Sequence, residues 1–143
     1  MKPPSLPRIL GALLGLAFAV PHVCATVNHR PTLSGLKDQR IESGQFANET
    51  FTIFDTETSA ASLIANAATT IASSNTTFIN PTKAANLSLA GSVCTLGFPT
   101  VTGDGYAVIT VTISDGTKST SRAFVVERAA KLGTAPTESR IIQ

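Results

Sequence analysis

The chain is poor in the residues that most often build catalytic, metal and sugar-binding sites. Its 143 residues include no Trp, one Tyr, two Cys and two His. Two cysteines cannot build a disulfide framework, and together with two histidines they supply few ligands for a Cys/His metal site. The 11 basic residues form no run. A nucleic-acid binder needs a basic patch or stripe, so we expect no nucleic-acid partner.

The start of the chain has the pattern of an export signal. Lys2 and Arg8 give a positive beginning, and 9–20 (ILGALLGLAFAV) is an apolar run that is too short to cross a bilayer comfortably. The sequence Val-Cys-Ala at 23–25 then places small residues at positions −3 and −1 of a cleavage site. We therefore predict a cleaved signal peptide over 1–25 and an exported protein, either secreted or at the cell surface.

Two alternatives to cleavage before Thr26 exist, an uncleaved anchor and lipid attachment at Cys24, although Pro-His-Val before this cysteine is not the usual lipoprotein sequence. Cleavage before Thr26 removes 25 of 143 residues and leaves 118, a suitable size for one domain. The two basic residues of the signal are then lost, so 9 basic residues balance 9 acidic ones. No other long apolar run follows, and we expect no membrane span in the mature chain.

The mature chain is rich in Thr, which favours strands because its branched Cβ packs well on a pleated surface. The clearest predicted strand is 106–114, where apolar residues alternate with small hydroxyl residues. An Asp-Gly pair at 115–116 indicates a tight turn, so 117–127 should return as the partner strand with Phe124 and Val126 inward. The inward residues of the first strand are predicted to be Ala107, Ile109, Val111 and Ile113.

Shorter strands are predicted earlier in the chain, from alternation and flanking turn residues. They lie at 32–36, 39–42, 50–53, 63–67, 87–89 and 96–98. The Ala-rich segment 59–72 fits a helix by propensity, but its flanks and β-branched residues favour a strand, which we predict. With about seven short strands separated by turns, the mature chain is predicted to be an all-β antiparallel sandwich.

Several segments, taken in order, resemble one family. They are 31–36 (PTLSGL) with 38–44, then 51–58 (FTIFDTET), 73–77 (SSNTT) and 105–116 (GYAVITVTISDG). Their order and spacing over 28–127 resemble the Ig-like and cadherin-like repeats that occur in tandem in large bacterial surface and secreted proteins. The resemblance implies an Ig-like (cadherin-like), Greek-key β-sandwich over 26–128. It implies no single function, because one fold hosts many roles.

The sequence departs from these repeats in several places. Residues 68–72 resemble a short insertion, and Cys94 occupies a place where polar residues are usual. Most members form long arrays, whereas this chain carries one copy. Its end, 129–143, contains TAPTESRI at 134–141, which is similar to HRPTLSGL at 29–36. This tail is interpreted either as the start of a truncated second repeat or as a disordered terminus.

Calcium is the first candidate ligand, because the resemblance implies ion binding through carboxylates at repeat junctions and Ca²⁺ takes six to eight oxygen ligands. Asp55 and Glu57 share one side of a predicted turn, and three other acids could join them if their loops gather at one end. The candidate metal residues are therefore Asp38, Glu42, Asp55, Glu57 and Asp115. The alternative is that all five are solvated turn carboxylates, with Asp115 shaping a hairpin.

Catalysis has weaker support. His29 lies close to the predicted signal, whereas a Ser-His-Asp arrangement needs a histidine that is held by packing. Cys94 alternates with Leu96, which indicates a buried structural thiol rather than a nucleophile. Tyr106 falls in the outward phase of its predicted strand, so we expect a surface aromatic. We predict no catalytic residues and no required cofactor.

These observations together predict an exported, non-enzymatic Ig-like module that binds a protein or cell-surface partner or serves a structural role. A calcium-dependent adhesion module of cadherin type is the alternative. A small secreted hydrolase or carbohydrate-binding domain is a weaker one, because sugar sites usually present aromatic platforms and this chain has few aromatic residues.

Overall fold

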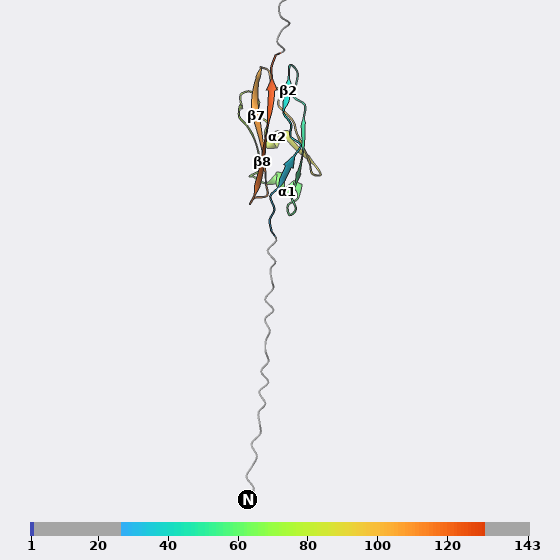
Figure 1. Ribbon diagram of the computed structural model, residues 1–143, viewed down its shortest axis with the longest axis vertical. Coiled ribbons are helices and arrows are strands. Elements are labelled where there is room, and N and C mark those ends of the chain that lie inside the picture. The colour runs from blue at the N-terminus through green and yellow to red at the C-terminus, as the bar shows by residue number, and fades with distance from the viewer. Residues whose placement is uncertain (2–26, 131–143) are drawn as a thin grey trace, which may run out of the picture.

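The computed structural model describes Met1 and residues 27–130 (Figure 1). The predicted signal peptide, apart from Met1, and nearly all of the predicted tail lie outside the described residues. The described part of the chain contains eight strands in two sheets of four, with two short helices. The prediction of an all-β protein is confirmed.

The first sheet has the strand order β1-β3-β6-β5, and each neighbouring pair is antiparallel. Its strands are β1 (Thr32–Ser34), β3 (Glu49–Phe54), β5 (Leu87–Ala90) and β6 (Val93–Leu96). The second sheet has the order β2-β8-β7-β4. Its strands are β2 (Gln39–Ile41), β4 (Thr70–Ser73), β7 (Gly105–Ser114) and β8 (Ser119–Arg128). In Figure 1 the long β7 and β8 lie side by side along one layer of an elongated body.

The β7–β8 hairpin follows the predicted alternation closely. Ser114 pairs with Ser119 across the turn, and Gly116 has a φ of 97°, which a residue with a side chain rarely adopts. The turn is closed by a hydrogen bond from the Asp115 N–H to the Lys118 carbonyl at 3.1 Å. The predicted inward residues are all buried: Ala107, Ile109, Val111, Ile113, Phe124 and Val126.

The two edge strands β1 and β2 come from one continuous segment that contributes to both sheets. After β1, the chain turns at Gly35 (φ 105°) and crosses to the second sheet, where β2 pairs with residues 126–128 of β8. This pair is parallel, which corrects the prediction of a wholly antiparallel sandwich. The parallel pairing follows from chain direction. The segment crosses to the second sheet without reversing, and the strand that it meets there, β8, runs in the same direction as β2.

The prediction of a strand over 59–72 is wrong for its first half. Residues Ala60–Ala65 form helix α1, and only Thr70–Ser73 form the strand β4. Ser59 caps the helix, because its Oγ accepts a hydrogen bond from the Ser62 N–H at 3.2 Å. Leu63 then enters the core completely. Helix propensity, a cap and one buried leucine therefore outweigh the strand-like flanks.

A second helix was not predicted. This helix, α2, spans Lys83–Asn86, and the Thr82 Oγ1 caps it by accepting from the Ala85 N–H at 3.3 Å. Its last residue leads directly into β5. A single turn of this length leaves almost no periodic pattern in a sequence, because periodicity needs several turns to become visible.

The core lies between the two sheets, as alternate residues of facing strands require. Three phenylalanines at one end pack edge to face, with ring centroids of Phe46 and Phe98 5.8 Å apart and those of Phe98 and Phe124 6.2 Å apart. The other fully or nearly fully buried apolar residues include Leu33, Phe51, Ile53, Leu63, Ile79, Cys94, Leu96 and Val101. Among the described residues, no helix has the length and apolar character that a membrane crossing needs.

Candidate functional site

Three of the five predicted metal residues lie toward one end of the sandwich. Asp55 and Glu57 follow β3, whose last residue pairs with the first residue of β1. Asp115 lies in the β7–β8 turn, and Thr120 just beyond this turn bonds to Pro31, which precedes β1. The structure therefore brings these three acids to the same end, at the entry of β1.

Each of these carboxylates already has a local structural role. Asp55 Oδ1 accepts the N–H groups of Glu57 at 2.9 Å and Thr58 at 2.7 Å, which shapes the turn into α1. Asp115 Oδ1 accepts the N–H groups of Lys118 at 2.7 Å and Thr117 at 2.6 Å. These backbone donors lower the pKa of Asp115, because they stabilise its charged form.

Glu57 is engaged by the segment before β1. It contacts the Nδ1 of His29, and the His29 backbone N–H donates to Glu57 Oε2 at 3.2 Å. The histidine hydrogen bond lowers the pKa of Glu57. His29 is thus exposed and bound to a turn carboxylate, and no hydroxyl nucleophile contacts it among the described residues.

The two other candidate ligands lie apart from this end. Asp38 precedes β2, and its Oδ1 accepts the Val125 N–H of β8 at 2.7 Å. Glu42 follows β2 and is exposed. Within residues 27–130, no three Asp, Glu, His or Cys side chains come close enough to hold a metal ion. The five predicted ligands are therefore not assembled into one cage.

We expect calcium to stabilise the isolated domain very little. With Asp55 and Glu57 supplying two nearby side chains, an extracellular-type Kd of about 10⁻³ M and millimolar calcium would add only about 0.4 kcal/mol. The melting temperature should rise by no more than about 3 °C. Melts with calcium and with chelator measure this shift, and Asp55→Asn serves as the matched variant. A rise of about ten degrees that Asp55→Asn abolishes would instead support the cadherin-type alternative.

Cys94 and Tyr106 take the positions that their strand phases predict. Cys94 is fully buried and unpaired, and burial raises the pKa of its thiol to about 11, so the thiol is a poor nucleophile at neutral pH. Tyr106 is 65% exposed. It faces Glu127 on β8, which pairs with Arg40 of β2 at 3.7 Å.

A hollow in the described surface lies elsewhere, between β1 and β8. It has a volume of about 420 Å³ and is lined by Arg30, Pro31, Thr32, Thr120, Ser121 and Arg122. A smaller hollow of about 120 Å³ continues it along the same two strands and is lined by Leu33, Ser34, Gly35, Leu36, Arg122 and Ala123. We call the two together the β1–β8 groove, since Arg122 belongs to both.

The groove exists because β8 is longer than its partner on this side. β2 pairs with β8 only over residues 126–128, whereas β7 pairs with β8 along its whole length. Residues 119–125 of β8 therefore have a neighbouring strand in their own sheet only on the β7 side. On the open side they face β1, which belongs to the other sheet.

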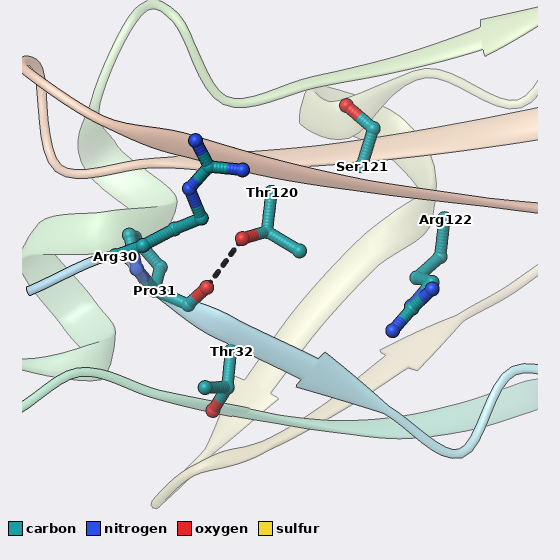
Figure 2. Close-up of a pocket in the computed structure, with 6 residues that line it drawn as sticks. All are labelled: Arg30, Pro31, Thr32, Thr120, Ser121 and Arg122. Carbon is teal, nitrogen blue, oxygen red and sulfur yellow. Dashed lines mark hydrogen bonds between the residues drawn. The ribbon is translucent and has the colours of Figure 1, made fainter.

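One hydrogen bond joins the two walls of the groove. Thr120 Oγ1 donates to the Pro31 carbonyl, which joins β8 to the segment before β1 (Figure 2). Figure 2 shows the guanidinium of Arg30 turned toward β8 and that of Arg122 turned toward β1. Both arginines are exposed. The groove is therefore an open, basic channel rather than an enclosed pocket.

Sequence reasoning did not find this groove. One signal for it was present, because Arg122 shares its strand phase with the buried Phe124 and Val126. A charged residue in the inward phase of a strand indicates that the sandwich is open at that position. Arg30 gives no such signal, since it lies before the first strand.

Comparison with known proteins adds no relative to this description. No protein-family model, curated protein or solved structure matches the chain.

Proposed function

We propose that this chain is an exported Ig-like β-sandwich that binds a partner protein through the β1–β8 groove. The two strand orders support the Ig-like assignment. Ig sandwiches carry strands A, B, E and D in one sheet and C, F and G in the other. The orders β1-β3-β6-β5 and β2-β8-β7-β4 match this arrangement when the segment of β1 and β2 is treated as a strand A divided between the sheets.

The proposal of export rests on the start of the sequence. The positive residues, the short apolar run and the Val-Cys-Ala site occur in the order that signal peptidase substrates have. An exported module of this size acts chiefly through its surface. Its partner would be a secreted or cell-surface protein, because those are the proteins that it would meet after export.

The binding proposal rests on one observation: the part of the β8 edge that precedes residue 125 has no strand partner. An unpaired strand edge is normally blunted or covered, because its free N–H and C=O groups invite pairing with another chain. Here residues 119–124 of the edge have no strand partner and lie beside a basic channel. Arg122 on that edge and Arg30 across the groove are both exposed, and their charge favours specific binding while it opposes self-association.

Site-specific photocrosslinking tests this proposal. A photoreactive residue replaces Ser121, which lines the groove, and in a matched control it replaces Thr50, which is exposed on the first sheet. The labelled chain is mixed with surface proteins of the organism that produces it. We expect a distinct adduct from position 121 that is absent from position 50 and is lost when Arg122→Glu is added, because the substitution reverses the charge of a side chain that lines both parts of the groove.

Two results would contradict the proposal. Equal adducts from both positions would indicate contact without a site, and adducts that persist with Arg122→Glu would place the partner elsewhere. The Arg40→Glu variant is the control for charge alone, since Arg40 is an exposed arginine of the same sheet that does not line the groove.

A further inference from the structure

The backbone of β8 offers regularly spaced hydrogen-bonding groups to the groove. In a strand, successive residues direct their N–H and C=O groups to opposite sides. The Val125 N–H points away from β7, since it donates to Asp38 Oδ1 at 2.7 Å. Ala123 and Ser121 share this phase, so their backbone groups also point away from β7 and into the groove.

Asp38 marks where the natural strand partner stops. Its carboxylate takes the acceptor position that a neighbouring strand would otherwise supply to Val125, and β2 begins at the next residue. Among the described residues, neither the Ser121 nor the Ala123 N–H has a hydrogen bond outside the β7–β8 ladder. A strand that continued the line of β2 would therefore lie beside Ser121 and Ala123, and no strand of residues 27–130 occupies that place.

The groove is positively charged, which favours an acidic occupant. Its lining includes two arginines and no carboxylate. Neither Arg30 nor Arg122 forms an ion pair with any residue that the structure describes. An incoming segment with acidic side chains would supply the missing partners, and a carboxylate can accept two parallel bonds from one guanidinium.

A second copy of this chain is a poor occupant. Pairing two β8 edges would place Arg122 of one copy close to the same arginine of the other, and like charges on paired strands destabilise the pairing. The inward phase of Arg122 strengthens this effect, because a charged side chain at such a position is one of the devices by which edges resist self-pairing.

We propose that the β1–β8 groove binds an extended acidic segment of the partner, which adds to β8 as a strand beside Ser121 and Ala123. This proposal rests on the proposed function, because it specifies the partner of the same groove. Backbone hydrogen bonds to the open edge supply the affinity, and acidic side chains at alternate positions meet Arg30 and Arg122. The segment continues the second sheet beyond the end of β2.

Amide hydrogen exchange, measured by NMR on the chain from Thr26 onward, tests this proposal. The probe is a blocked octapeptide of alternating Val and Glu. One control peptide alternates Val and Lys, and a second replaces each Val of the probe by Pro, which keeps the charge but removes N–H groups that a strand needs. At ten times its Kd, the probe should slow exchange at Ser121 and Ala123 by about tenfold.

The two control peptides should leave both exchange rates unchanged, and Arg122→Glu should abolish the protection while Arg40→Glu preserves it. The NMR spectrum of each variant shows that it is folded. Equal protection by the Pro-containing peptide, or binding without protection of Ser121 and Ala123, would overturn strand addition. If position 121 still yields its crosslinked adduct in that case, the binding function stands and only the mode of binding is wrong.

Discussion

Replacing Ile109 by Ala should lower the free energy of unfolding by about 2–5 kcal/mol. Ile109 is fully buried in the middle of β7, where it pairs with Phe124 of β8 and Ser73 of β4. Truncation at Ile109 removes apolar contacts that this side chain makes in the core between the two sheets. Because the core is closely packed, the substitution leaves a cavity that neighbouring side chains only partly fill.

Urea denaturation measures this change, and two further variants define its origin. Ile109→Val should cost only about 0.5–1.5 kcal/mol, because it removes a single methylene group. Thr110→Ala, one position along the same strand, should cost clearly less than Ile109→Ala, since Thr110 is half-buried and faces outward. Equal losses from the substitutions at 109 and 110 would show that the inward phase of β7 is assigned incorrectly.

Replacing Thr69 by Val should also destabilise the fold strongly, by about 1–3 kcal/mol for each polar group left without a partner. Thr69 is only 1% exposed. Its Oγ1 donates to the Leu63 carbonyl at 2.7 Å and accepts the Ser114 N–H at 3.0 Å. One hydroxyl thus joins the end of α1 to the end of β7, and valine has the same shape but neither bond.

The matched control is Thr70→Val, which changes the neighbouring, exposed threonine of β4. Valine is at least as favourable as threonine on a strand surface, so this variant should be close to neutral. A similar loss at both positions would indicate that valine itself, rather than the lost bonds of Thr69, weakens this segment. Denaturation of the two variants under the same conditions decides the matter.

Local signals account for the parts of the fold that the sequence predicts correctly. The β7–β8 hairpin combines period-two alternation with an Asp-Gly turn, and both signals lie within 24 consecutive residues, 105–128. The burial of Cys94 and the exposure of Tyr106 follow from the same alternation. In these places local preference and tertiary packing agree, so pattern reasoning is sufficient.

The errors arise where distant contacts decide. Alternation cannot tell whether Leu63 is buried by a strand or by a helix, and the Ser59 cap resolves this only once the segment packs on β7. The parallel β2–β8 pair depends on which edge the chain reaches after Gly35. Turn chemistry indicates a bend there, but not the sheet that the following strand joins.

The candidate sites differ in the same way. Each predicted calcium ligand was identified from its own turn, and its real partner is mostly a nearby backbone N–H, as with Asp55 and Asp115. The β1–β8 groove instead requires Arg30 and Arg122 to meet from the two ends of the domain sequence. No local pattern contains that information, except the inward phase of Arg122.

The burial of Cys94 gives this chain an internal reporter of how often its core opens. The thiol lies on the central strand β6, opposite Phe51 on one side and Leu89 on the other. A thiol reagent can reach it only when the core between the two sheets opens. With a pKa of about 11, moreover, only about a thousandth of the thiol is ionised at pH 8 while the core is closed. The labelling rate of Cys94 therefore reads the population of opened molecules directly, with no probe added to the sequence.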